Sequence, residues 1–527
     1  MSDRPSARRA LISVSNKRGV LEFARALTSL GWEIVSTGGT ADALRREDVP
    51  VVPIEQVTGF PEMMEGRVKT LHPNVHGGLL ARRDHPDDIA AMRAQGITPI
   101  DLVAVNLYPF RETVAKAETT FAQAIEQIDI GGPSMLRSAA KNHRDVIVVV
   151  DPDDYAMVIE ALKSGSLTPG GPGSEALGLR LKLAAKVFAH TSAYDAAILG
   201  YLTRSAEDLP PQISLVLERR QALRYGENPH QRAALYATDE RGIRELHQLH
   251  GKELSFNNLL DVDAAVQAVA PWPGDMAKPA CAIIKHTTPC GIALGRSAED
   301  AYRRALATDR TSAFGSVIAF NTVVTLAAAE AMRDLFVEVV VAPRIDAGAL
   351  AVFREKKNLR VVEVPPPPDE PSWDFKRVRG GLLVQDRFRF SQVAGAAGWR
   401  VATRRAPSDA EWNDLRFAWA AVGSVKSNAV LLARDEAAIG IGAGQMSRVD
   451  ASFLAVHKAR QQGHEPRGAV LASDAFFPFR DGVDEAAAAG VAAIIQPGGS
   501  VRDAEVVAAA DEHDLAMILT GMRQFRH

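Results

Sequence analysis

The chain has 527 residues, and at roughly 100–200 residues per domain this length predicts three or four packing units. Its 46% hydrophobic and 24% charged residues are typical of an ordinary globular protein. Lys and Arg number 61 against 64 Asp and Glu, so the net charge of -3 gives no reason to expect a nucleic acid or an anionic membrane as a partner. Any anion must be held by local groups within a site.

The cysteine count and the termini bear on the compartment. Cys281 and Cys290 are too few for a disulfide framework, which favours a reducing, cytoplasmic location. The apolar stretch near the N-terminus is too short for a signal-peptide core. No apolar run is long enough to span a bilayer, so we expect no membrane association.

The first part of the chain alternates short apolar runs with helical patterns. Continuous apolar runs indicate strands that are buried on both faces, as in a parallel sheet. The order of strand, turn and helix predicts an α/β fold with ligands at the carboxyl ends of the strands. In chain order, we expect strands at 10–14, 33–36, 102–106 and 146–150, and helices at 20–30, from 41 to 46 and over 177–202.

Polar and proline-rich segments suggest where domains end. We place the first boundary near residue 203, before the polar segment 205–211, although the Gly- and Pro-rich stretch 164–174 also interrupts the pattern. A second break at 365–371 is rich in proline, which indicates a stiff connector. The sequence therefore predicts a first domain at 1–203 and a second at 204–527, itself two units split near 365–380.

Two glycine- or hydroxyl-rich turns follow strands of the first domain. The segment SVSNK (13–17) adds a lysine, and STGGT (36–40) precedes a helix whose N–H groups can donate to an anion. A single Gly-Gly turn before a helix is more often structural than phosphate-binding. Two such turns at one sheet edge favour a phosphorylated ligand.

Three further clusters add polar groups to the first domain. Arg67 and Lys69 are two residues apart and face one side of an extended chain, and Tyr108 follows a strand. Asp129 opens a Gly-Gly helix start, and the helix ends near Lys141. Taken singly, each residue is better explained by structure, Tyr108 as a packed aromatic and Lys141 as a charge that the helix dipole favours.

The motifs SVSNK, STGGT, GRVKTLHP, NLYPF and DIGGPSMLRSAAKNH, with their spacing, resemble the IMP cyclohydrolase domain, whose fold is similar to methylglyoxal synthase. The resemblance implies that the catalytic residues are Lys69, Tyr108, Asp129 and Lys141. With the turns described above, the nucleotide-binding candidates are Ser13, Ser15, Lys17, Ser36, Thr37, Gly38, Gly39, Thr40, Arg67, Thr70, Ile130, Gly131 and Gly132.

Lys285 and His286 follow directly after a predicted buried strand at 281–284. A Lys-His pair there is suited to acid–base chemistry, although a strand-end histidine is about as often satisfied by backbone. His286 and Cys290 superficially suggest a zinc deaminase. No Glu follows in the required pattern, and Ala293 stands where the second cysteine should be, so no zinc is expected.

The segments RYGENPHQ, KELSFNN, IKHTTPCGIA, SAFGS, GGLLVQD, VKSNAV, GIGAGQMSR, SDAFFPFRD, QPGGSVRD and MRQFRH resemble the aminoimidazole carboxamide ribonucleotide formyltransferase. That resemblance implies two cytidine-deaminase-like α/β units without zinc. It implies catalysis by Lys285, His286 and Asn428. The implied nucleotide-binding residues are Arg224, Tyr225, Asn258, Gly315, Arg523 and Phe525, and the folate-side residues are Phe314, Glu338, Phe476 and Asp481.

Together the resemblances cover nearly the whole chain and imply the last two steps of purine nucleotide synthesis. The co-substrate would be 10-formyltetrahydrofolate, and the formyltransferase site would lie at a homodimer interface. A structural monovalent cation is a further candidate ligand. The alternatives are a nucleotide-sensing protein without catalysis, or an enzyme that retains one of the two activities.

Overall fold

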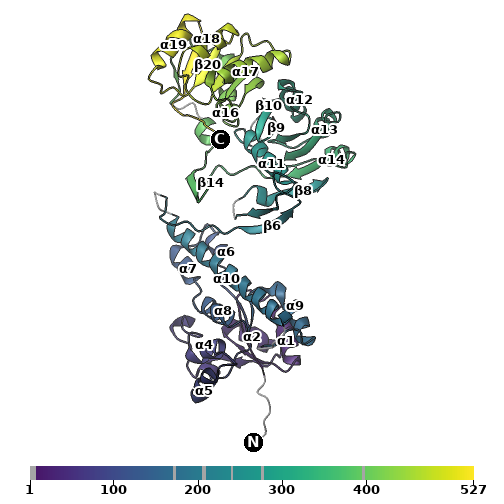
Figure 1. Cartoon of the computed structure of the whole chain (residues 1–527), viewed down its shortest axis with the longest axis vertical. Coiled ribbons are helices and arrows are strands. Elements are labelled where there is room, and N and C mark those ends of the chain that lie inside the picture. The colour runs from purple at the N-terminus through teal and green to yellow at the C-terminus, as the bar shows by residue number, and fades with distance from the viewer. Residues whose placement is uncertain (1–7, 170–173, 205–208, 239–240, 274–277, 395–397) are drawn as a thin grey trace. The chain divides into compact units, whose positions relative to one another are not determined.

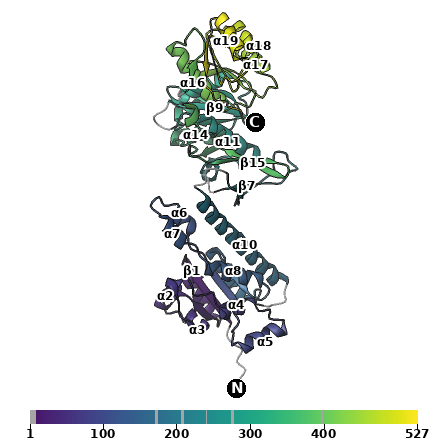
Figure 2. The same ribbon diagram turned by 90° about the vertical axis from the view of Figure 1, so that its left-hand side faces the viewer.

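The computed structural model describes residues 8–169, 174–204, 209–238, 241–273, 278–394 and 398–527 (Figures 1 and 2). The chain forms two compact units, Met1–Val216 and Leu217–His527. The division falls after the helix that ends at Thr203, a little beyond the boundary that the sequence predicts.

The first unit is built on a five-stranded sheet in the order β3-β2-β1-β4-β5, with every neighbouring pair parallel. Alternate strand residues face opposite sides, as Leu11 packs on one core and Ala10 and Ile12 pack on the other. Helices α1 and α9 cover one face, and α4, α8 and α10 cover the other. Figure 2 shows the long helix α10 running beside α8.

The elements of the first unit are β1 (Arg9–Val14), α1 (Val20–Ser29), β2 (Glu33–Ser36), α2 (Gly38–Arg46), β3 (Val52–Pro53), α3 (Ile54–Thr58), η1 (Met64–Gly66), α4 (Pro73–Leu80), α5 (Pro86–Ala94), β4 (Leu102–Asn106), α6 (Phe110–Val114), α7 (Phe121–Glu126), α8 (Gly131–Lys141), β5 (Ile147–Val149), η2 (Pro152–Asp154), α9 (Tyr155–Lys163) and α10 (Ser174–Thr203). The α/β class and the parallel sheet are confirmed. One difference matters for the site: α2 begins at Gly38 rather than at residue 41, so the two glycines form the first turn of the helix.

The second unit contains a mixed twelve-stranded sheet in the order β16-β21-β20-β19-β17-β18-β10-β9-β11-β12-β13-β8, with two small hairpins, β6-β7 and β14-β15. Its elements are β6 (Glu218–Leu223), β7 (Ala233–Ala237), η3 (Ile243–Glu245), β8 (His247–His250), α11 (Phe256–Val269), β9 (Ala280–Lys285), β10 (Thr288–Leu294), α12 (Ala298–Thr308), β11 (Ser316–Phe320), α13 (Leu326–Ala331), β12 (Val337–Ala342), α14 (Ala347–Arg354), β13 (Arg360–Glu363), β14 (Trp373–Val378), β15 (Gly381–Asp386), α15 (Ser391–Ala394), β16 (Arg400–Val401), α16 (Asp409–Val422), β17 (Val430–Arg434), β18 (Ala437–Gly442), α17 (Arg448–Gln461), β19 (Val470–Ser473), α18 (Asp481–Ala488), β20 (Ala493–Gln496), α19 (Asp503–Glu512) and β21 (Ala516–Leu519).

The second unit repeats one arrangement. The order helix, hairpin, helix, strand, helix, strand, helix, strand runs from α11 to β13 and again from α16 to β21. The two copies meet where β10 pairs with β18, in the middle of the sheet. Helices α11 and α16 share one continuous core on one face, whereas each copy has its own core on the other. The proline-rich segment 365–371 lies between the two copies.

Candidate functional site

Hydroxyl groups bind the ends of β1 and β2 to each other in the first unit. Ser13 Oγ lies 2.7 Å from Thr37 Oγ1, and Ser36 Oγ donates to the Ile12 carbonyl at 2.6 Å. Thr40 Oγ1 accepts from the Val14 N–H at 3.1 Å and donates to the Val14 carbonyl at 3.0 Å. These bonds fix the start of α2 against the carboxyl edge of the sheet.

A third strand holds the 13–17 turn through Asn106, a residue that was not predicted from the sequence. Asn106, at the end of β4, accepts from the backbone N–H of Ser15 at 2.7 Å and of Asn16 at 2.9 Å. Its side-chain amide donates back to the Asn16 carbonyl at 2.9 Å. A polar residue that ends an otherwise apolar buried strand was the signal available in the sequence.

Two lysines lie beside the first turn of α2. A methyl group at Gly38 would lie 2.9 Å from Lys69 Nζ, and one at Gly39 would lie 4.0 Å from Lys17 Nζ. A side chain at Gly38 would crowd the Lys69 ammonium group, whereas one at Gly39 would only touch that of Lys17, and both ammonium groups lie near a helix N-terminus whose dipole favours an anion. Lys69 forms an ion pair with Glu62, and Arg67 forms one with Glu126. Neither glutamate was predicted.

Asp129 organises the start of α8. Its carboxylate accepts from the Gly132 N–H at 2.8 Å and from the backbone N–H of Tyr108. Burial raises the pKa of the Asp129 carboxyl, although these two hydrogen bonds act in the opposite direction. Thr70 Oγ1 would lie 2.7 Å from a methyl group at Gly131, so the 67–70 segment also reaches this helix start.

The predicted residues of the first unit do not all meet. Tyr108 and Ile130 are exposed by 49% and 58%, so both are accessible at the edge of this cluster. Lys141 is the last residue of α8, ten residues after Gly131, and at 1.5 Å per residue it lies about 15 Å along the helix from the Gly-Gly start. Within this chain, the helix therefore separates Lys141 from the cluster.

In the second unit, Lys285 ends β9 and is held by backbone carbonyls. Its Nζ donates to the Phe314 oxygen at 2.6 Å and to the Gly315 oxygen at 3.2 Å. Phe314 is 62% exposed, and its ring lies 5.0 Å from that of Phe336, a residue that was not predicted. The ammonium group thus lies beside an exposed aromatic pair.

His286 and Thr287 form the tight turn between β9 and β10. Both have left-handed backbone, with φ of 53° and 60°. Asp261 on α11, also not predicted, accepts from the Thr287 N–H at 2.6 Å. Burial raises the pKa of the Asp261 carboxyl, while that hydrogen bond and the charges of His286, Lys285 and Lys426 oppose the rise. His286 itself is exposed.

Asn428 is fixed by a buried ion pair. Its Oδ1 accepts from Arg448 at 2.7 Å and its Nδ2 donates to the Gln445 carbonyl at 2.9 Å. Arg448 pairs with Asp474, whose side chain is 0% exposed. Asp474 also accepts from the Ala429 N–H at 3.1 Å. A charge-assisted network of this kind orients the Asn428 amide.

The last residues of the chain bind the same loop. Ser427 donates its N–H to the Arg526 carbonyl at 2.9 Å, and the Arg526 N–H donates to Ser427 Oγ at 3.0 Å. The Gln524 N–H donates to the Asp474 carbonyl at 2.9 Å. Gln524 is 3% exposed, so its role is to anchor the tail, which the sequence alone did not indicate.

The predicted nucleotide-binding arginines stack on their aromatic neighbours. The Arg224 guanidinium lies 5.7 Å from the Tyr225 ring centroid, and that of Arg523 lies 4.3 Å from the Phe525 ring. Asn258 is buried in a capping box, where its Oδ1 accepts from the Ser255 N–H at 3.1 Å. The oxygen of its side-chain amide therefore already has a hydrogen-bond partner within the helix cap.

The predicted folate-side residues fall into two groups. Glu338 pairs with Arg360 at 2.5 Å in the first copy of the repeat, where Phe314 also lies. Phe476 and Asp481 belong to the second copy, and Asp481 accepts from the Gly482 N–H at 2.7 Å. Among the described residues, no hydrogen bond, ion pair or ring contact joins the two groups.

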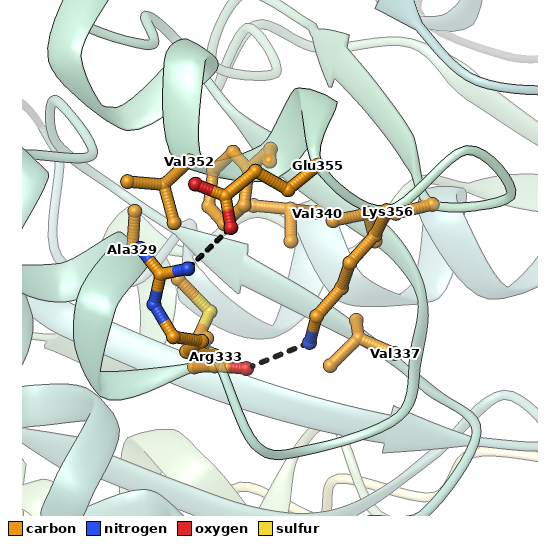
Figure 3. Close-up of a pocket in the computed structure, with 10 residues that line it drawn as sticks. Ala329, Arg333, Val337, Val340, Val352, Glu355 and Lys356 are labelled. Carbon is orange, nitrogen blue, oxygen red and sulfur yellow. Dashed lines mark hydrogen bonds and ion pairs between the residues drawn. The ribbon is translucent and has the colours of Figure 1, made fainter.

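Two cavities in the second unit differ greatly in size. The one among β12, α13 and α14 is apolar and measures about 10 Å³, room for a single water molecule (Figure 3). Lys356 reaches into its wall and donates to the Met332 carbonyl at 3.2 Å. A cleft of about 540 Å³ lies instead between β7, α11, the β14-β15 hairpin and the C-terminal tail, and Phe525 is part of its lining.

Comparison with known proteins identifies the family. The model of the AICARFT/IMPCHase bienzyme matches residues 139–458, more than half of the chain, and the model of the MGS-like domain matches residues 19–134. The chain belongs to the AICARFT/IMPCHase bienzyme family. A solved structure described as "Crystal structure of ForH" is 39% identical over an alignment that covers 38% of this chain and 100% of that one, with a TM-score of 0.34.

Family membership confirms the resemblance drawn from the motifs, and with it an enzyme of purine biosynthesis. In the described part of the chain, no group of three or more His, Cys, Asp or Glu side chains is placed to hold a metal ion. Among the same residues, no helix is long and apolar enough to cross a membrane.

We expect Lys69→Ala to reduce cyclisation of supplied formylated nucleotide by about 100-fold, because it removes the ammonium nearest the start of α2. Steady-state kinetics with the pre-formylated substrate would measure the loss. Lys163→Ala is the matched control, since Lys163 is also paired with a glutamate but lies at the end of α9. Its activity should stay within about twofold of the unaltered protein. Near-normal cyclisation by Lys69→Ala would contradict the assignment.

Protonation of Asp129 should determine how kcat/KM for cyclisation falls as the pH is lowered. Its pKa is raised by burial, so as pH falls the carboxylate takes up a proton at a higher pH than the usual value of about 3.9. A base is lost on protonation, and kcat/KM should therefore decline below that raised pKa. Profiles of the unaltered protein and Asp129→Asn, measured from about pH 4 upward, would test this. An identical acid limb in both would rule Asp129 out as the titrating group.

Proposed function

We propose that the bienzyme transfers the formyl group of 10-formyltetrahydrofolate to the 5-amino group of aminoimidazole carboxamide ribonucleotide and then closes the product to IMP. The observation that supports this best is that two polar sites, each suited to one step, lie on two different compact units. The family is itself named for both activities.

In formyl transfer, the amine nitrogen bonds to the formyl carbon and the bond from that carbon to the folate N10 breaks. The amine loses a proton and N10 gains one. We assign His286 to the amine proton because it is exposed on a fixed turn at the end of β9. Two carbonyls take two of the three N–H donors of Lys285, leaving one to stabilise developing charge or to assist protonation of N10.

Asn428 is assigned to the formyl oxygen. One N–H of its amide is used by the Gln445 carbonyl, so the second can donate to the oxygen as negative charge develops there. Arg448 fixes the orientation of the amide through Oδ1, which lowers the cost of reorganisation during reaction. On the folate side, the exposed Phe314 offers an aromatic face, and Asp481 offers a carboxylate for pterin N–H groups.

In cyclisation, the carboxamide nitrogen attacks the formyl carbon and a water molecule leaves. An amide nitrogen is a weak nucleophile, so the enzyme must supply near-attack geometry and stabilise the oxyanion. The first turns of α2 and α8, with Lys69, supply donors. Asp129 and Tyr108 are the groups that can move protons, and the position of Lys141 at the far end of α8 leaves its role to be tested separately.

We further propose a homodimer with the formyltransferase site at its interface. The support is that Phe314 and Glu338 lie in one copy of the repeat, while Phe476 and Asp481 lie in the other. Contacts that join these folate-side groups are then expected between protomers. The rival functions, a nucleotide sensor or an enzyme with a single activity, do not account for polar sites in both units.

His286→Ala should lower formyl transfer by at least about 100-fold and leave cyclisation of supplied formylated nucleotide unchanged, since the two residue sets lie on separate units. Both steps can be followed by absorbance. His513→Ala, which removes an exposed histidine paired with Asp484 elsewhere in the unit, is the control. Loss of both activities in His286→Ala would contradict the two-site assignment, and nucleotide binding without turnover in the unaltered protein would favour the sensor.

We assign His286 and Arg523 of each formyltransferase site to different protomers, so mixing His286→Ala with Arg523→Ala protomers should restore about a quarter of the formyl transfer activity. Half of the dimers are then mixed, and each mixed dimer has one intact site of two. The measurement is activity after the two proteins are exchanged by mild dissociation, with sedimentation velocity to establish the dimer. A monomer at assay concentration, or no recovery in mixed dimers, would overturn the shared site.

A further inference from the structure

The two copies of the repeat in the second unit share a detail that goes beyond their topology. In each copy, the sixth residue of the first helix is an aspartate that accepts backbone N–H groups from the hairpin turn. Asp261 of α11 accepts from Thr287 at 2.6 Å, and Asp414 of α16 accepts from Asp435 at 2.9 Å and from Glu436 at 2.7 Å.

The turns that these aspartates hold have the same backbone. His286 and Thr287 have φ of 53° and 60°, and Asp435 and Glu436 have φ of 52° and 59°. Residues other than glycine rarely adopt this left-handed conformation. Each turn therefore depends on the hydrogen bonds that hold it in place.

The basic residue that ends the preceding strand is also matched. Lys285 donates to the carbonyls of Phe314 and Gly315, and Arg434 donates to those of Glu465 and Arg467. The two copies thus share hydrogen bonds from the first helix to the hairpin turn and from the end of the preceding strand to the loop before the next strand.

The charges around the two turns are opposite. Burial raises the pKa of both aspartates, but around Asp261 the charges of His286, Lys285 and Lys426 oppose the rise, whereas around Asp414 the carboxylates of Asp435 and Glu436 add to it. The first turn presents basic groups that can serve formyl transfer, and the second presents two acids. The same backbone support therefore serves a turn with candidate catalytic groups in one copy only.

We propose that Asp261 is a positioning residue for formyl transfer, which fixes the His286–Thr287 turn through its hydrogen bond to the Thr287 N–H, and that Asp414 is its non-catalytic counterpart. The inference rests on the proposed formyltransferase function and adds a residue that acts through His286. Because Asp261 supports the backbone and is assigned no contact with substrate, its loss should affect turnover more than nucleotide binding.

The test compares Asp261→Ala with Asp414→Ala in the full-length protein, by kinetics of both steps and by thermal unfolding. Both variants remove backbone support from a hairpin turn, so both should lower Tm, Asp414→Ala by at least as much because Asp414 accepts two N–H groups and Asp261 accepts one. Asp261→Ala should lower kcat for formyl transfer by about tenfold or more, since small displacements of a catalytic group are costly, with KM for the nucleotide changed by less than about threefold. Asp414→Ala should keep kcat within about twofold, and cyclisation should be unchanged in both.

Asp261→Asn is the conservative variant, because its side-chain oxygen can still accept from Thr287. It should retain kcat within about threefold of the unaltered protein, and it decides the question if Asp261→Ala cannot be obtained folded. Equal kcat losses in Asp261→Ala and Asp414→Ala, or a loss in Asp261→Asn as large as in Asp261→Ala, would overturn the positioning role. Absence of formyl transfer by the unaltered protein would instead overturn the proposed function, and the inference with it.

Discussion

Aspartates that are partly or fully withdrawn from solvent and accept backbone N–H groups hold the loops of both candidate sites. Asp129 holds the start of α8, Asp261 the His286 turn, and Asp474 the segment that carries Asn428. Burying a carboxylate is costly, and hydrogen bonds from backbone donors recover part of that cost. Each loop is therefore held to the aspartate whose carboxylate its N–H groups stabilise, and the reactive side chains gain fixed positions without being buried themselves.

Much of this arrangement could be predicted from the sequence because its signals are local. The apolar runs that became β1, β2 and β4 and the turns that follow them predicted the parallel sheet and its ligand edge. The apolar run before Lys285 and His286 likewise predicted that both residues lie at the end of a buried strand. Long motifs supplied the family, which the comparisons confirmed.

The residues that were missed act across long stretches of sequence. Asp261 acts on a turn 26 residues away, and Gln524 anchors to Trp419 at a separation of 105 residues. No periodicity reports such contacts, because an aspartate on an amphipathic helix looks the same whether it faces solvent or a turn. Lys141 shows the converse: its motif suggested a role beside Asp129, while the length of α8 separates them within this chain.

The attachment of the tail to the Ser427 loop has a consequence for how the protein is made. The hydrogen bond from Arg526 to Ser427 joins residues 99 apart, so the Ser427–Asn428 segment is synthesised well before Arg526, one of its hydrogen-bond partners. Domains generally fold from the N-terminal side during synthesis. The first unit can thus be folded while the second copy of the repeat is still incomplete, and the hydrogen bonds between Ser427 and Arg526 form only after residue 526 has been added.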